Sequence, residues 1–224
     1  MKPLSECWLY AFVDTVCLRG RAPHIVAQQL CDGGADLIQL RAKQSSREEV
    51  LRMAEAILPV TRRAGVPLVI NDHVSVAQEL GAEFCHLGQE DFFDAGYTQV
   101  SQLTATASPQ PARSLRLGIG LSTHGPDQSK RALAAGPDYI AVGPVYPTTT
   151  KPDAKPIASD YLRWAAVHVS VPWFAIGGIN LDNLNRVLAA GAQRICVVSA
   201  ILNAEDVAAA CHRFKQRLGP RAAG

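Results

Sequence analysis

Side chains suited to binding phosphate recur along this 224-residue chain, each shortly after a run of apolar residues. Three of them are cations, namely Arg41, Lys43 and Lys151. Neutral hydrogen-bonding groups accompany them, at Gln39, Asn71, Ser122 and in the threonine run 148–150. Guanidinium, ammonium, amide and hydroxyl groups together suit the oxygens of a phosphate or diphosphate. The set therefore predicts an anionic substrate.

Two carboxylates fall in the same kind of position and need a different explanation. Asp72 follows Asn71 directly, and Asp91 ends the segment 88–91. Carboxylates beside phosphate-binding cations would repel an anionic substrate unless they hold a divalent cation. Mg2+ takes oxygen ligands and bridges carboxylates to phosphates. We therefore predict that Asp72 and Asp91 ligate Mg2+.

The chain that carries these residues alternates between short apolar runs and longer amphipathic stretches. Eight apolar runs are typical of strands, at residues 8–13, 37–40, 67–70, 84–87, 116–121, 139–142, 173–176 and 194–198. Helical periodicity is found at residues 24–30, 47–63, 75–80, 128–135, 161–168, 181–190 and 205–218, and a weaker helix is predicted at 96–103. Strands that are apolar on both faces indicate a parallel sheet covered on both sides.

One helix-to-strand turn recurs, as Gly34-Ala35-Asp36, Gly81-Ala82-Glu83, Gly136-Pro137-Asp138 and Gly191-Ala192-Gln193. Its glycine can end a helix in the left-handed conformation, so the repeat marks a βα unit. Eight such units in a chain of this size predict an α/β fold, a single (β/α)8 TIM barrel over residues 1–224. The alternative, a doubly wound open sheet, lacks its Gly-x-Gly-x-x-Gly after the first strand. We expect a surface insertion at 104–114 and a frayed tail at 219–224.

In a barrel of this kind the active site forms at the C-terminal ends of the strands, so distant residues meet on one rim. Every candidate above lies at the end of a predicted strand or shortly after it. Gly177 and Gly178 follow the seventh strand, and Ser199 lies between the eighth strand and the last helix. That is the usual place of a phosphate site in this fold. The arrangement predicts two anionic groups, one beside Mg2+ and one near strands seven and eight.

Simpler explanations exist for each residue taken alone. Arg41 or Lys43 could be a solvated cation. Asp72 could cap the following helix, and Asp91 could belong to an exposed acidic turn. The central histidines have no metal-binding spacing, and we expect them to be structural: His73, His86 and His124.

Composition limits the class of protein. With 48% hydrophobic residues and a net charge of +2, the chain is neither disordered nor basic enough to indicate a nucleic-acid partner. No apolar run approaches the ~20 residues of a membrane helix, and no signal peptide is evident, so we expect no membrane partner. The six cysteines form no Cys-x-x-Cys pair, which favours free thiols and a cytoplasmic protein. A homo-oligomer is compatible with the sequence, which does not specify the oligomeric state.

The motifs, taken in order, resemble those of thiamine-phosphate synthases. They are Gln-Leu-Arg-Ala-Lys at 39–43, Asn-Asp at 71–72, Gly-Gln-Glu-Asp at 88–91, Thr-Thr-Thr-Lys at 148–151, Ile-Gly-Gly-Ile at 176–179 and Val-Ser at 198–199. The resemblance extends from about Tyr10 to Ile201. The family is a (β/α)8 barrel that joins hydroxymethylpyrimidine diphosphate to a thiazole phosphate and releases pyrophosphate. Ala42 and Pro152 depart from the Glu and Lys that many members have there.

This resemblance implies a role for each candidate. The pyrimidine diphosphate would be held by Gln39, Arg41, Lys43, Asn71, Ser122 and Lys151, of which Arg41, Lys43, Ser122 and Lys151 would act in catalysis. Asp72 and Asp91 would hold Mg2+. The thiazole phosphate would be held by Thr148, Thr150, Gly178, Val198 and Ser199. Two other functions remain open, an isomerase resembling thiazole tautomerase and a non-enzymatic barrel that binds thiamine phosphate.

Overall fold

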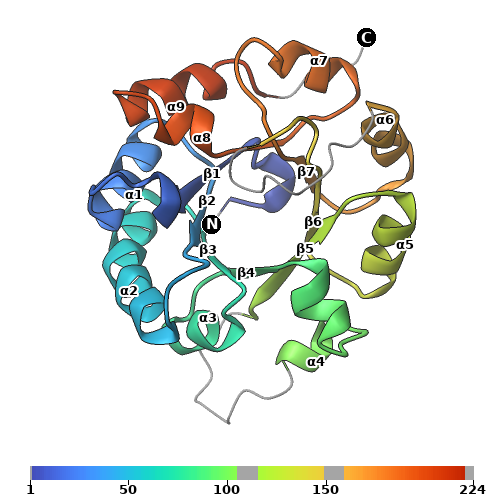
Figure 1. Cartoon of the computed structure of the whole chain (residues 1–224), viewed down its shortest axis with the longest axis horizontal. Coiled ribbons are helices and arrows are strands. Elements are labelled where there is room, and N and C mark those ends of the chain that lie inside the picture. Colours follow the sequence, from blue (N-terminus) through green and yellow to red (C-terminus); the bar gives the residue numbers. More distant parts are fainter. Residues whose placement is uncertain (1, 105–115, 149–158, 220–224) are drawn as a thin grey trace.

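Eight parallel strands form a closed barrel with helices around it (Figure 1). Each strand pairs with the next along the chain, and β8 pairs with β1. The computed structural model describes residues 2–104, 116–148 and 159–219. The strands are β1 Leu9–Asp14, β2 Leu37–Arg41, β3 Leu68–Asn71, β4 Phe84–Leu87, β5 Gly118–Thr123, β6 Tyr139–Val142, β7 Trp173–Ala175 and β8 Ile195–Val197. The (β/α)8 barrel predicted from the sequence is confirmed.

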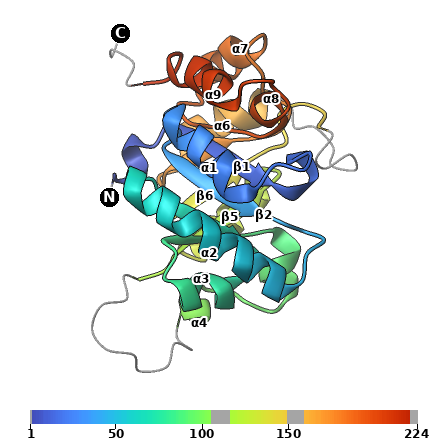
Figure 2. The same ribbon diagram turned by 90° about the vertical axis from the view of Figure 1, so that its left-hand side faces the viewer.

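Helices surround the strands in Figure 1, and Figure 2 shows α1, α2 and α3 across one side of the barrel. They are α1 Pro23–Asp32, α2 Arg47–Ala64, α3 Val74–Leu80, α4 Ser101–Thr104, α5 Pro126–Ala134, α6 Ser159–His168, α7 Leu184–Ala189, α8 Ser199–Leu202 and α9 Val207–Lys215. Short helical turns are η1 Leu4–Glu6, η2 Thr15–Cys17 and the π-helix η3 Glu90–Asp94. None of the helices in the described ranges is long and apolar enough to cross a membrane.

The interior of the barrel is filled mainly by aromatic side chains. The rings of Tyr10 on β1 and Tyr139 on β6 lie 6.0 Å apart, although these strands are not neighbours in the sheet. Glycines on β5 make room for this packing, because a Cβ on Gly120 would lie 2.1 Å from the Tyr139 ring. A Cβ on Gly118 would lie 2.3 Å from the ring of Phe84. The Gly-Ile-Gly sequence on this strand therefore serves steric packing.

The recurring helix-to-strand turn has a second function beyond ending a helix. Its acidic side chains accept hydrogen bonds from backbone N–H groups at the start of the preceding strand. Asp36 accepts from the N–H of Trp8, just before β1, and from the N–H of Leu9, the first residue of β1. Glu83 accepts from Leu68 in β3, and Asp138 accepts from Ile119 in β5; those two donors lie 2.9 and 2.8 Å away. The glycines of the turn, at 34, 81, 136 and 191, all have positive φ angles.

Local differences from the predicted elements lie mostly between β4 and β5. The weak helix predicted at 96–103 forms only at its end, as the single turn α4, and the π-helix η3 precedes it. Strand β5 begins and ends two residues later than predicted, because Ser122 and Thr123 pair with β6. A further short helix, α8, begins at Ser199, so the helix that follows β8 is not the last one. Apart from Thr104 and Gly219, the predicted insertion and tail lie outside the described residues.

Candidate active site

Three charged residues that follow consecutive strands meet at the C-terminal end of the barrel. Lys43 follows β2, Asp72 follows β3, and Asp91 lies in η3 after β4. The Lys43 ammonium lies 2.6 Å from an Asp72 carboxylate oxygen and 3.6 Å from an oxygen of Asp91. These three residues, which we call the acidic cluster, were predicted to meet on the rim, and the structure brings them together.

The acidic cluster holds two carboxylates against one ammonium, and its electrostatics reflect that imbalance. Burial disfavours the charged form of Lys43, but the hydrogen bond with Asp72 and the attraction of both carboxylates outweigh it and raise the pKa of Lys43. Burial raises the pKa of the Asp72 carboxyl, Lys43 opposes that rise, and the charge of Asp91 adds to it. Two acids therefore compete for one cation, and one negative charge in the cluster has no counterpart within it.

The backbone holds Asp72 in an unusual conformation. Its φ angle is 62°, in the left-handed region that residues other than glycine rarely adopt. The Asp72 N–H donates to the carbonyl of His86, and the Asn71 side chain donates to the Asp72 carboxylate at 2.6 Å. Such a conformation costs of the order of 1 kcal/mol and is typical of functional sites. The carboxylate is thereby fixed toward Lys43.

The π-helix η3 presents Asp91 to the same point. The wide turn closes with a bond from the Ala95 N–H to the Glu90 carbonyl, and π-turns are often found at functional sites. Asp91 packs closely on Gly88, where a Cβ would lie 2.8 Å from its carboxylate oxygen. Gly88 thus leaves space for Asp91. The sequence did not predict the π-helix itself.

The acidic cluster has the chemistry of a Mg2+ site. Mg2+ is bound in many enzymes by one or two carboxylates together with water and substrate phosphate oxygens. Asp72 and Asp91 supply two carboxylates directed at one cationic group, with a negative charge to spare. Within the described ranges no group of three or more acidic, histidine or cysteine side chains could form a cage around a metal ion. Asp72 and Asp91 are oxygen donors of the kind that Mg2+ prefers, so the residues present fit this cation.

Arg41 has a partner that the sequence analysis did not single out. Its guanidinium donates to the Asp14 carboxylate at 2.8 Å; the Asp14 side chain is buried, with 1% of its surface exposed, and the Arg41 side chain is partly buried, with 13% exposed. Asp14 ends β1 and also accepts a hydrogen bond from the Val16 N–H. Its position at a strand end is the signal that could have identified it. Asp14 thus fixes the Arg41 side chain at the end of β2, two residues before Lys43 of the acidic cluster.

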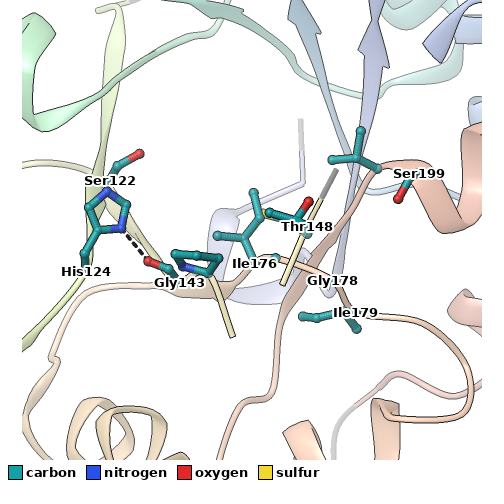
Figure 3. A pocket seen from close by; sticks show the side chains of 12 residues that line it. Ser122, His124, Gly143, Thr148, Ile176, Gly178, Ile179 and Ser199 are labelled. Carbon is teal, nitrogen blue, oxygen red and sulfur yellow. Dashed lines mark hydrogen bonds between the residues drawn. The ribbon is translucent and has the colours of Figure 1, made fainter. Parts of the chain in front are cut away.

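A separate pocket opens beyond strands β5 to β8 (Figure 3). In Figure 3, Ser122 and His124 lie on one side of it and Ser199 on the other. Four of the residues predicted to bind the second anion line this pocket: Thr148, Gly178, Val198 and Ser199. Ser122 lines it as well. Thr150 and Lys151 lie outside the described residues.

The glycine pair in this pocket is required by the packing of two loops. Gly177 and Gly178 have φ angles of 104° and 63°. A Cβ on Gly178 would lie 2.5 Å from the carbonyl oxygen of Pro147, in the loop after β6. That loop is bonded to the loop after β7, since the Tyr146 N–H donates to the Gly177 carbonyl at 3.0 Å. The pair thus has a structural role whether or not it also contacts a ligand.

Gln39 and Ser122 form hydrogen bonds with side chains inside the barrel. Gln39 is 2% exposed, and its side-chain amide donates to the Tyr10 hydroxyl. The Ser122 hydroxyl lies 2.9 Å from Nε2 of His86, on the neighbouring strand. Gln89 donates to the Ser122 carbonyl, which fixes this end of β5 to the segment before η3. Ser122 therefore connects the pocket to the β4 side of the rim.

A closed parallel barrel whose polar side chains gather at the C-terminal ends of its strands defines the class of (β/α)8-barrel enzymes. Within that class, the family model described as thiamine monophosphate synthase matches residues 9–201. The chain belongs to this family of thiamine-phosphate synthases.

Individual relatives agree with that assignment. A thiamine-phosphate synthase of Thermus thermophilus is 44% identical over 188 residues, which cover 83% of this chain and 84% of the relative. The Halalkalibacterium halodurans synthase is 37% identical over 96% of this chain and 97% of its own length. Among solved structures, a thiamine phosphate pyrophosphorylase from Pyrococcus furiosus has a TM-score of 0.79 at 29% identity, covering 95% of this chain and 96% of that one.

Proposed function

We propose that this enzyme joins hydroxymethylpyrimidine diphosphate to a thiazole phosphate, forms thiamine phosphate and releases pyrophosphate. The observation that carries the proposal is that the rim has two distinct parts. The acidic cluster lies beyond β2 to β4, and the glycine-lined pocket lies beyond β5 to β8. Ser122 lines the pocket and contacts His86 on β4, whose backbone carbonyl accepts a hydrogen bond from the N–H of Asp72 in the acidic cluster. A reaction between two phosphorylated substrates needs two such parts side by side.

The cations act on the leaving group. In the proposed reaction the bond between the pyrimidine methylene carbon and the diphosphate oxygen breaks, and negative charge gathers on the departing pyrophosphate. Arg41, held by Asp14, and Lys43 stabilise this charge from fixed positions, which is where electrostatic catalysis is strongest. Lys151 is assigned the same role by its motif and lies outside the described residues. Gln39 and Asn71 would orient the pyrimidine diphosphate.

Asp72 and Asp91 would hold Mg2+ in this proposal. A bound Mg2+ neutralises charge on diphosphate oxygens and so favours their departure. The support is the excess of negative charge in the acidic cluster together with the direction of both carboxylates toward Lys43.

The second substrate would be anchored by its phosphate in the pocket. Thr148, Gly178, Val198 and Ser199 line that pocket, and Thr150 is assigned with them from its motif. Anchoring aligns the thiazole nitrogen with the pyrimidine carbon, where the new C–N bond forms. The scheme uses no protein nucleophile. Cys196 lines the pocket, but burial raises the pKa of its thiol well above the usual value, so it remains protonated.

The direct test is to incubate the purified protein with both substrates and Mg2+. We expect thiamine phosphate and pyrophosphate in equal amounts, and no product after addition of EDTA. A tautomerase-like isomerase would convert the thiazole without consuming the pyrimidine diphosphate, and a binding protein would retain thiamine phosphate without turnover. Product formation that is insensitive to EDTA would contradict the Mg2+ assignment.

Substitution of Asp91 tests the metal role within the same assay. Asp91→Ala should lower kcat about 100-fold or more while leaving the fold intact, because it removes a charge from a rim position without opening the core. Lys151→Ala should have an effect of the same order. Glu90→Ala is the matched control, since Glu90 is the exposed acidic neighbour in η3 and makes no contact with Lys43 among the described residues. Near-wild-type turnover of Asp91→Ala would exclude its assigned role.

We also propose a cytoplasmic location. The support is that all six cysteines are free thiols and five of them are buried, so the fold uses no disulfide.

A further inference from the structure

A chain of hydrogen bonds crosses the inside of the barrel from Gln39 to Ser122. Gln39 on β2 donates its amide N–H to the hydroxyl of Tyr10 on β1. That hydroxyl lies 3.0 Å from the hydroxyl of Tyr139 on β6, which lies 3.2 Å from Nδ1 of His86 on β4. Nε2 of His86 lies 2.9 Å from the Ser122 hydroxyl on β5. We call these five side chains the relay.

The relay is sealed from water over most of its length. Tyr10 and Tyr139 are 1% and 0% exposed, and Phe174 packs on both of their rings. Burial raises the pKa of each phenol well above 10, so each hydroxyl keeps its proton. A buried hydroxyl that fails to donate costs roughly 1–3 kcal/mol, so every proton in the relay needs an acceptor.

The donor at one end sets the direction of the others. The Gln39 amide nitrogen only donates, so the Tyr10 oxygen accepts and Tyr10 passes its own proton to Tyr139. Tyr139 must then donate to Nδ1 of His86. The imidazole consequently carries its proton on Nε2 and donates it to the Ser122 oxygen.

The opposite direction leaves a buried proton without an acceptor. If Nδ1 of His86 carried the proton, Tyr139 would have to donate to Tyr10. The Tyr10 oxygen would then accept from both Gln39 and Tyr139, and its own proton would meet no acceptor in the part of the chain that the structure describes. The observed orientation of Gln39 therefore selects one tautomer of His86.

We propose that Tyr10, Tyr139 and His86 are positioning residues that fix the Gln39 amide and turn the Ser122 hydroxyl proton into the active site. The proposal rests on the proposed function, in which Ser122 contacts an anionic substrate. Because His86 donates to the Ser122 oxygen, the Ser122 proton points to an acceptor elsewhere, and phosphate oxygens are acceptors only. A hydroxyl that accepts one hydrogen bond is a stronger donor for the next. His86, expected from the sequence to be structural, thus acts through Ser122.

The first test measures the tautomer of His86 in the ligand-free protein by 15N NMR at about pH 8, where an ordinary histidine is neutral. We expect the Nε2–H form in the wild type. His124 is an internal reference with the opposite assignment, because its Nδ1 faces the carbonyl of Gly143, which can only accept. Tyr139→Phe removes the donor to His86 Nδ1 and should release the tautomer preference. An Nδ1–H or doubly protonated His86 in the wild type would overturn the proposal.

The second test is a double-mutant cycle on the synthase reaction. Tyr139→Phe should lower kcat/KM about 5- to 10-fold, the equivalent of one hydrogen bond. In a Ser122→Ala background the same change should cost less than about twofold, because the relay then has no hydroxyl to orient. The matched control is Tyr161→Phe. Its buried hydroxyl bonds Ser129 and Thr123 at 2.6 and 2.7 Å, outside the relay, so kcat/KM should not change.

Equal losses in both backgrounds, or no loss in either, would show that Tyr139 does not act through Ser122. The two tests also separate this proposal from the proposed function. If the wild type forms no thiamine phosphate, the proposed function fails, and the tautomer measurement, which needs no substrate, decides the relay alone.

Discussion

Arg41 owes its fixed position to a single carboxylate. An arginine at the edge of a substrate site would lose conformational freedom each time it bound phosphate, and the ion pair with Asp14 removes most of that freedom beforehand. Since Asp14 is almost fully buried, its contribution comes from holding Arg41 in place as well as from charge.

Asp14→Asn should therefore weaken both the fold and the reaction. It leaves Arg41 partly buried without a counter-charge, and we expect the free energy of unfolding to fall by about 3 kcal/mol and kcat/KM by at least about 10-fold. Chemical denaturation and steady-state kinetics measure the two effects. Asp127→Asn is the control, because Asp127 is 99% exposed in its pair with Lys130 and should change neither quantity. Unchanged kinetics in Asp14→Asn would show that Arg41 needs no anchor.

The rim residues could be predicted from the sequence, whereas the contacts that support them could not. Arg41, Lys43, Asp72 and Asp91 follow apolar runs, and the barrel rule places strand ends together. Asp14 is separated from Arg41 by the whole of α1, and nothing local indicates the pairing. Tyr10 and Tyr139 look like ordinary strand residues, since a strand that is apolar on both faces does not reveal which side chains point inward.

At the scale of elements, β5 is shaped by what its neighbours place inside the barrel. Gly120 faces the Tyr139 ring so closely that no Cβ fits. The sequence does not indicate the role of the Gly-Ile-Gly run of β5, because steric relief across a sheet leaves no local pattern. The π-helix η3 was missed for a related reason: a single wide turn is too short to show periodicity.

Gly120→Ala should disturb the packing of the barrel interior around Tyr139. The added methyl group would displace the Tyr139 ring, and overpacking of this kind typically costs about 1–3 kcal/mol. We expect that loss in the free energy of unfolding, measured by urea denaturation. Gly125→Ala is the matched control, since a Cβ added there would meet no atom within 4 Å and the backbone is extended. Equal free energies of unfolding for the two variants would contradict the prediction, because the Tyr139 ring would then move without loss of stability.

At the scale of the whole molecule, Asp36 joins the two ends of the described chain. Its carboxylate accepts hydrogen bonds from Lys2 near the start, from Lys215 at the end of α9, and from the backbone of β1. Burial opposes its charge, but the bonds from Lys2, Lys215 and the Leu9 and Trp8 N–H groups outweigh burial and hold its pKa below the usual 3.8.

Asp36→Asn should destabilise the barrel in a pH-dependent way. A depressed pKa in the folded state stabilises folding fully above the pKa of the unfolded chain, and this contribution is lost as the pH falls through the folded-state pKa. We expect the variant to be about 2 kcal/mol less stable at neutral pH, with a difference that shrinks below about pH 4. Denaturation curves at several pH values measure it. A difference that persists unchanged in acid would assign the loss to packing.

The acidic turns divide the barrel into pairs of strands. The carboxylate of Asp36, just before β2, accepts a hydrogen bond from the backbone of β1. In the same way, Glu83 before β4 accepts from β3, and Asp138 before β6 accepts from β5. A fragment that ends between β2 and β3 keeps donor and acceptor together, whereas one that ends between β1 and β2 separates the Leu9 N–H from its carboxylate. The natural joints of this barrel therefore fall after β2, β4 and β6. The pairs β1–β2, β3–β4 and β5–β6 are the smallest pieces that could be exchanged between related barrels with these opening amides still satisfied.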